Sequence, residues 1–251
     1  MEYWIVSMLI ISFINSQCLK CHSFSLPEKE KFYDDYYKSV FQGLHSKILC
    51  SEKFGKTVDY TTGPEILINC SSQNLAHVPK NLPDMTAALL LKGNNISKLH
   101  NNTFLPAVLL KYLDLSNNRL ILIETNAFRG MKSLETLILA HNNLFVTGGY
   151  SPLKKDCFEP LSISLKYLDI RHQRPATTNN NLKAKGRTRY PDALCNLKGL
   201  QTLFIDYIIC QLKCKSFPSC YGTLNKLITL VISKEDPDKQ RDVHLPGTFL
   251  K

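Results

Sequence analysis

The stretch LKYLDLSNNRL at residues 110–120 decides the fold of this chain. The same spacing of residues occurs 24 residues earlier, as TAALLLKGNNI at 86–96, and 24 residues later, as LETLILAHNNL at 134–144. Within each copy, the Leu-x-Leu step has the two-residue period of a β-strand, which places both leucines on one face. One short strand cannot bury that face alone, whereas stacked copies can. The spacing therefore predicts a parallel sheet with one strand per repeat.

This spacing, L-x-x-L-x-L-x-x-N-x-L, resembles that of a leucine-rich repeat. Each strand ends at an asparagine, Asn94, Asn118 or Asn142, whose buried amide can bond backbone groups of neighbouring turns. Phe104 and Phe128 each follow an asparagine by ten residues and predict a second apolar column behind the sheet. The predicted fold is an α/β solenoid: a leucine-rich-repeat horseshoe with a parallel concave sheet and a disulfide-closed N-terminal cap.

After residue 145 the repeats continue with irregular spacing. Further strands are predicted within 165–170, 200–205 and 227–232, which gives about six repeats over residues 86–251. Gln173 and Ile208 stand where the first two of these units should have asparagine, so their turns are expected to be less tight. The final unit is truncated, and we expect it to expose an unpaired strand edge and to be the least stable.

The N-terminal part divides into three segments. Residues 1–17 are predicted to be a secretory signal peptide, because 4–14 are apolar apart from Ser7 and Ser12 and too short to span a bilayer; a buried element is the alternative. Residues 18–49 form an extension in which aromatic residues recur at helical spacing, so a short amphipathic helix is predicted. Residues 50–85 are predicted to cap the first repeat as a disulfide-closed hairpin.

The chain contains nine cysteines, which suits an exported protein with disulfides. Cys50 and Cys70 bracket the cap, and we predict a bridge between them. Cys157 and Cys195 flank equivalent positions of successive units and could come within bridging reach. The remaining connectivity cannot be deduced from the sequence. No zinc or redox pattern surrounds the cysteines, so no metal and no cofactor are predicted.

The segment CSSQNLAHVPKNLP at 70–83, followed by repeats with the asparagine-to-phenylalanine spacing, resembles the start of a Toll-like receptor ectodomain. The YPDAL stretch at 190–194 looks most like the invertebrate members. The resemblance covers roughly residues 50–251 and implies an innate immune, pattern-recognition receptor that binds microbial molecules or proteins, with a possible dimer partner. A secreted adhesion or matrix repeat protein, or a soluble decoy, is the alternative.

The outward positions of the strands form the candidate ligand face. They include Tyr112, Asp114, Tyr167, Asp169 and Phe204, aromatics among charges that suit a protein, glycan or microbial ligand on the concave or lateral face. A solvated sheet face would have the same composition.

Two further features bear on binding. Residues 171–189 carry six basic and no acidic residues, so the loop suits an anionic ligand, or else is a solvated insertion. His141 and His172 occupy equivalent positions of their units, which suits a paired response to pH or two ordinary surface histidines.

No catalytic motif is present, so the chain is not expected to be an enzyme. Asn69, Asn95 and Asn101 each begin an acceptor sequence for N-glycosylation, which fits an extracellular location. No stretch after the signal peptide has the roughly 20 apolar residues that a membrane helix needs. The expected activity is therefore binding outside the cell, as a secreted protein or as the ectodomain of a membrane receptor.

Overall fold

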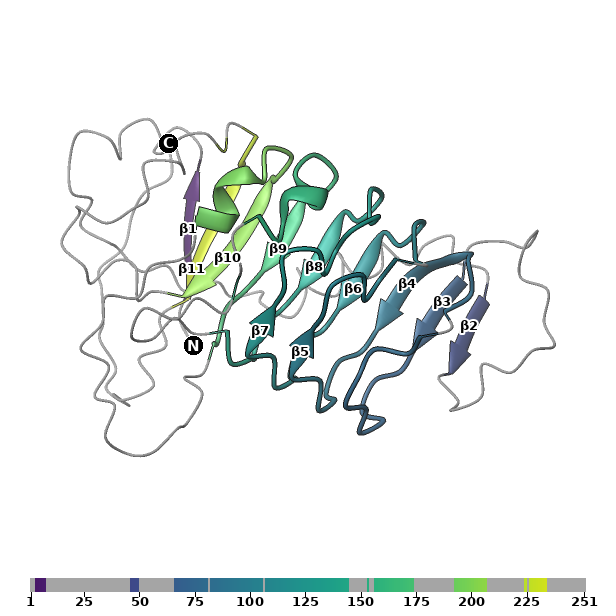
Figure 1. Ribbon diagram of the computed structural model, residues 1–251. Coiled ribbons are helices and arrows are strands. Elements are labelled where there is room, and N and C mark those ends of the chain that lie inside the picture. Colours follow the sequence, from purple (N-terminus) through teal and green to yellow (C-terminus); the bar gives the residue numbers. More distant parts are fainter. Residues whose placement is uncertain are drawn as a thin grey trace, which may run out of the picture.

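A computed structural model of the 251-residue chain describes residues 3–7, 46–49, 66–80, 82–105, 107–144, 153, 156–173, 192–206, 224 and 226–233. Within these residues, nine strands form one sheet in the order β1-β11-β10-β9-β8-β6-β4-β3-β2 (Figure 1). Their bounds are β1 Tyr3–Ser7, β2 Ser46–Leu49, β3 Ile66–Asn69, β4 Thr86–Leu90, β6 Tyr112–Asp114, β8 Thr136–Ile138, β9 Tyr167–Asp169, β10 Thr202–Asp206 and β11 Thr229–Ser233. From β2 to β11 all neighbours are parallel. The predicted repeat solenoid with a parallel sheet is confirmed.

Short elements lie on the other side of the core. Strands β5 (Lys98–Leu99) and β7 (Leu122–Ile123) pair in parallel, and Leu153 continues this pairing in the next unit as a single bridge to Ile123. The 3₁₀ helices η2 (Glu159–Leu161) and η3 (Asp192–Asn196) lie in the later units. Their apolar side chains belong to the same buried cluster as the inward leucines of the sheet. Each unit is therefore one strand, a turn, and a return across the core.

The core is ordered in columns because equivalent residues of successive units are in register. Leu89 pairs with Leu113, Leu113 with Leu137, and Leu137 with Leu168 across the sheet. Behind them the rings of Phe104, Phe128 and Phe158 stack, with centroids 5.8 Å apart at each step. All three rings are fully buried. The aromatic column predicted from the spacing thus runs through three units, and Leu194 is the buried residue at the next position.

The N-terminal strands differ from the sequence-based picture. Residues 3–7, inside the predicted signal peptide, form β1, and the cleavage of that segment stays a prediction. The end of the predicted helical extension is strand β2; its remainder lies outside the described residues. Strand β3 runs parallel to both β2 and β4, so the described part of the cap joins the main sheet and is not a hairpin.

The outer edge of the last repeat, strand β11, is paired with another strand, which differs from the expectation. The prediction that β11 has an unpaired edge is wrong for the described chain, because β1 pairs with it antiparallel along all five residues, from Tyr3 opposite Ser233 to Ser7 opposite Thr229. A strand edge that carries free N–H and C=O groups attracts another strand. Here that strand comes from the far end of the same chain.

Three cysteines are described, and one expected pairing is wrong. Cys70 and Cys195 are each disulfide-bonded, whereas Cys157 is a free thiol, so Cys157 and Cys195 do not form a bridge. Burial raises the pKa of Cys157 to about 12, which keeps the thiol protonated and unreactive at neutral pH. Cys50 lies outside the described residues, and its bridge to Cys70 stays a prediction.

Candidate ligand-binding face

A ladder of side-chain amides closes the turn after each strand. The Asn118 amide nitrogen donates to the carbonyls of Leu91, at 2.9 Å, and Leu115, at 3.0 Å, while its oxygen accepts from the backbone N–H of Ile96 at 3.1 Å. The other two ladder residues, Asn94 and Asn142, make the same kind of bonds one unit to either side. Each amide therefore satisfies backbone groups of its own turn and of the preceding one, groups that burial would otherwise leave unpaired.

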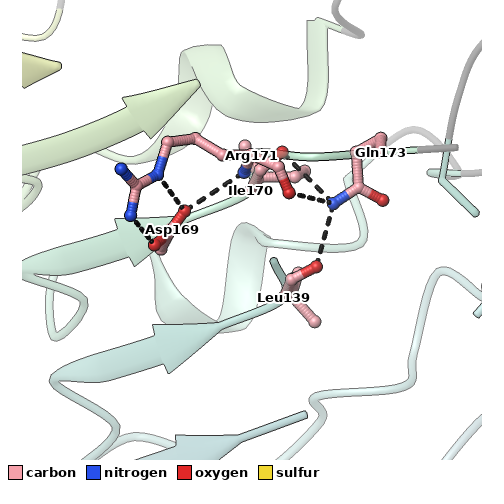
Figure 2. Close-up of polar contacts among 5 residues, drawn as sticks. All are labelled: Leu139, Asp169, Ile170, Arg171 and Gln173. Atoms are coloured by element: carbon pink, nitrogen blue, oxygen red, sulfur yellow. Dashed lines mark hydrogen bonds and ion pairs between the residues drawn. The ribbon is translucent and has the colours of Figure 1, made fainter. Parts of the chain in front are cut away.

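Gln173 takes the asparagine position in the fourth unit and makes an equivalent set of bonds (Figure 2). Its Nε2 donates to the carbonyls of Leu139, at 2.9 Å, and Ile170, at 3.2 Å. Its Oε1 accepts from the backbone N–H of Leu144 at 2.9 Å. The expectation that this turn is loosened by the loss of asparagine is therefore wrong, because the longer amide reaches the same groups.

We expect Gln173→Ala to lower the free energy of unfolding by about 1–3 kcal/mol, because it leaves buried backbone groups without a partner. Asn118→Ala should cost about the same for the same reason. Denaturant unfolding followed by circular dichroism measures both. Asn117→Gly is the matched control, since Asn117 is exposed and has a positive φ that glycine adopts freely. A Gln173→Ala variant as stable as that control would exclude Gln173 from the ladder.

The five residues of the candidate ligand face do project to the side of the sheet opposite the leucine core. Tyr112 and Asp114 flank the inward Leu113 in β6, and Tyr167 and Asp169 have the same positions in β9. All are buried in the whole chain, however: Tyr112 is 1 % exposed and Phe204 4 %. The interpretation as a solvated sheet face is therefore wrong. A second buried cluster covers this concave side, made of Leu67, Ala88, Tyr112, Ile138, Ala140, Tyr167 and Phe204.

A buried ion pair between Asp169 and Arg171 lies beside this concave cluster, next to Phe204 (Figure 2 shows the pair). The Arg171 guanidinium donates from Nε to Asp169 Oδ1 at 2.9 Å and from its terminal nitrogen to Oδ2 at 2.6 Å. The guanidinium carbon also lies 4.3 Å from the ring centroid of Phe204, and the Tyr167 and Phe204 rings are 5.2 Å apart. Arg171, counted with the basic loop in the sequence, is therefore neutralised and buried; residues 174–191 lie outside the described part of the chain.

A column of left-handed residues borders the concave face. The position before each ladder amide has a positive φ in four successive units, at Gly93, Asn117, His141 and His172. The imidazole rings of His141 and His172 stack, with centroids 4.3 Å apart. His172 is buried, so the interpretation as two ordinary surface histidines is wrong for it, and the shared response to pH stays a prediction.

The three asparagines that begin N-glycosylation sequences differ in their surroundings. Asn101 is exposed; its backbone N–H donates to Glu124 at 2.8 Å and its Oδ1 accepts from Asn126. That backbone N–H, together with the His100 side chain, holds the pKa of Glu124 below its usual value. The side-chain amide nitrogen of Asn95 donates a hydrogen bond to the side-chain oxygen of Asn74. The Asn69 sequence includes Cys70, which is buried and disulfide-bonded.

Membrane-spanning helices and metal-binding clusters are both absent from the described residues. No helix in the described ranges combines the length and apolar character that crossing a membrane requires. Among the same residues, no group of three or more His, Cys, Asp and Glu side chains is placed to hold a metal ion. The recognisable features are therefore the two faces of the sheet and the lateral surfaces of the turns.

The leucine-rich repeat family model matches residues 87–144. Together with the parallel sheet of one strand per unit, this match shows that the chain has a leucine-rich-repeat fold. Leucine-rich repeat-containing protein 3 of Danio rerio is 38% identical over 96 residues, 38% of this chain and 33% of the relative. Human opticin is 32% identical over 107 residues (43% and 29%), and human leucine-rich repeat-containing G-protein coupled receptor 5 is 39% identical over 77 residues (31% and 8%).

The chain spans a third or less of the length of these three relatives. They are leucine-rich-repeat proteins of other kinds, so the Toll-like resemblance stays a prediction. Among solved structures, human 5T4 (Wnt-activated inhibitory factor 1, trophoblast glycoprotein) is 26% identical, with a TM-score of 0.41 over 55% of this chain and 57% of that chain. The leucine-rich repeat domain of APL1B is 16% identical, with a TM-score of 0.43 over 73% and 43%.

Proposed function

We propose that this chain is an extracellular recognition module that binds a protein or microbial ligand, as the ligand-binding part of a Toll-like pattern-recognition receptor. It acts by binding and not by catalysis. The observation that carries the proposal is an exposed apolar edge of the repeats, formed by Leu105, Val108 and Leu109. The concave cluster around Tyr112, Tyr167 and Phe204 is buried within the chain, so it supports the fold and not the contact.

This lateral edge is the contact area that we propose for the ligand. Leu105, Val108 and Leu109, on the segment that leads into β6, are 48 %, 48 % and 38 % exposed. Apolar side chains that gather at an exposed edge, rimmed by polar residues, commonly mark an interaction surface. The ligand we propose would contact this edge, where it meets apolar surface without any rearrangement of the chain.

Binding of defined ligands by the secreted chain tests the proposal. The chain is produced in insect cells and presented to lipopolysaccharide, peptidoglycan, β-glucan and heparin in a biolayer interferometry series. The Toll-like proposal expects saturable binding of a microbial product that Leu109→Lys weakens and Ile163→Lys leaves unchanged, since Ile163 is 77 % exposed in another unit. Binding of heparin alone would reject the proposal.

The alternative is a secreted adhesion or matrix protein, or a soluble decoy. The observation in its favour is the net charge of +10, which suits sulfated glycans. For this function, heparin binding should fall steeply with salt, because it rests on released counterions and screened charge. Microbial products should then give no saturable signal.

Export of the chain predicts an N-linked glycan at Asn101. Its side chain is exposed and the Thr103 hydroxyl of the acceptor sequence is in place, bonded to the His100 carbonyl at 2.6 Å. We expect a glycosidase to lower the mass of protein from a eukaryotic host, and Asn101→Gln to remove part of that shift. Asn69→Gln is the matched control and should leave the shift unchanged, because Cys70 is buried in a disulfide. An unshifted mass would argue against export.

A further inference from the structure

Two isoleucines in the later repeats are the most exposed large apolar side chains of the described residues. Ile163, between η2 and β9, is 77 % exposed, and Ile228, directly before β11, is 60 % exposed. The core of these units does not require them, because Leu165 and Leu227 are the residues that are buried there. Packing of the repeat therefore does not account for either isoleucine.

Both isoleucines lie on the edge of the sheet at which the parallel strands begin (Figure 1). Backbone bonds join the turns of this edge in series: the N–H of Gly199 donates to the Ser162 carbonyl at 2.7 Å, and the N–H of Ile228 donates to the Gln201 carbonyl at 2.8 Å. Gly199 also packs directly against the Ile163 carbonyl, where a larger residue would clash. Because β9 and β11 are two strand-to-strand steps apart, the isoleucines are separated by about 10 Å along the edge.

Lysines occupy the neighbouring positions of this edge. By the register of the strands, Lys132 and Lys198 are the counterparts of Ile163 in the units on either side, and Lys226 lies two residues before Ile228. All three lysines are exposed, and within the described residues none of them forms an ion pair. Together these five residues form a lysine–isoleucine edge, on which apolar and cationic side chains alternate.

Nearby acidic side chains do not offset the charge of the three lysines. Glu135 is already paired, with Lys166 at 2.8 Å. Asp156 is half-buried and accepts a bond from the Asn196 amide at 3.1 Å. Glu159 is exposed at the start of η2, one carboxylate against three ammonium groups. The chain as a whole carries a net charge of +10, so a partner for this edge should be negatively charged.

The spacing of the side chains favours a lipid surface over a protein as that partner. A protein contact of ordinary size buries about 800 Å² on each partner around a central apolar cluster. Two isoleucines about 10 Å apart, with a lysine between them, form no such cluster. A bilayer requires none, because each apolar side chain enters the headgroup layer separately and each lysine adds attraction to anionic headgroups.

We propose that the lysine–isoleucine edge docks on the surface of an anionic phospholipid membrane, with Ile163 and Ile228 inserted among the headgroups. Lys132, Lys198 and Lys226 then face the lipid phosphates. The chain lies on the bilayer in this state and does not cross it. This inference does not depend on which ligand the Leu105–Leu109 edge binds.

Co-sedimentation of the full-length chain with phospholipid vesicles tests the docking. Vesicles of equal parts phosphatidylglycerol and phosphatidylcholine should bind the chain at physiological salt, and vesicles of phosphatidylcholine alone should not. Lys198→Glu/Lys226→Glu should weaken binding more than about 25-fold, because each lysine near an anionic surface contributes about five-fold and the new carboxylates are repelled. The matched control, Lys92→Glu/Arg119→Glu, makes the same change of net charge at exposed positions beyond the ends of β4 and β6 and should weaken binding clearly less.

A second variant separates insertion from charge. Ile163→Ser/Ile228→Ser keeps the net charge, and we expect vesicle binding to fall at least about ten-fold while circular dichroism shows a folded chain. Absence of binding to anionic vesicles, full binding by the serine variant, or equal losses in the two charge-reversed variants would overturn the proposal. Leu109→Lys should bind vesicles no less tightly than the unchanged chain. Failure of this inference is therefore distinguishable from failure of the proposed function.

Discussion

Asp169→Ala is expected to lower the free energy of unfolding by about 3–5 kcal/mol, one of the largest effects of any single substitution in this chain. The carboxylate is 1 % exposed and accepts two guanidinium bonds from Arg171 as well as the backbone N–H of that residue at 3.1 Å. Removing it leaves a buried cation without its anion, and low-dielectric surroundings make that costly. Denaturant titration of the folded chain measures the difference.

The control for this prediction removes both charges together. In Asp169→Leu/Arg171→Met the apolar side chains replace the pair, and the variant should recover most of the stability, since buried pairs and apolar replacements of similar volume are often close in free energy. Asp114→Ala provides a second comparison at the same position of another unit, where the carboxylate accepts the Ser116 N–H at 2.8 Å. Equal losses in the single and double variants would show that the charge pair is not the cause.

Phe128→Ala is expected to cost about 3–5 kcal/mol through the cavity that it leaves in the aromatic column. The ring is fully buried between Phe104 and Phe158, with centroids 5.8 Å from each, and has no solvent-exposed side into which the chain could collapse. The loss should appear as a lower midpoint of thermal and denaturant unfolding. It should also reduce amide protection in β6 and β8, whose leucines share the same cluster.

The chain itself offers the control for this substitution. Leu194 occupies the corresponding position of a later unit and is fully buried there, so leucine is accepted in the column. Phe128→Leu should therefore lose clearly less stability than Phe128→Ala. If Phe128→Ala and Phe128→Leu lowered the unfolding midpoint equally, the stabilisation would come from stacking of the aromatic rings and not from filling the cavity.

The strands and the aromatic column could be predicted because both depend on local periodicity. Leu113 and Phe128 recur in step with their counterparts, and the period alone places them inside. The role of Gln173 in the amide ladder was harder to predict, since the repeat pattern shows only that asparagine is absent from this position. What matters there is whether an amide can reach three backbone groups, which depends on the path of a longer turn.

The concave side could not be predicted for a different reason. Alternation places Tyr112 and Asp169 on the outward face, but whether that face meets solvent is decided by segments distant in sequence. The same holds for Arg171, which composition assigns to a basic loop and the structure places in a buried ion pair. The pairing of β1 with β11 likewise joins residues from the two ends of the chain, beyond the reach of any repeat pattern.

The amide ladder has a consequence for how this protein can change in length. Asn142 bonds the carbonyls of Leu115 and Leu139, one from the turn before and one from its own, just as Asn118 bonds those of Leu91 and Leu115. A duplicated unit inserted between them could form the same amide-to-carbonyl hydrogen bonds with the unit before it and the unit after it. Gain or loss of a whole unit by recombination should thus leave every interior turn complete, whereas an insertion of a few residues would misplace one amide and break the ladder there.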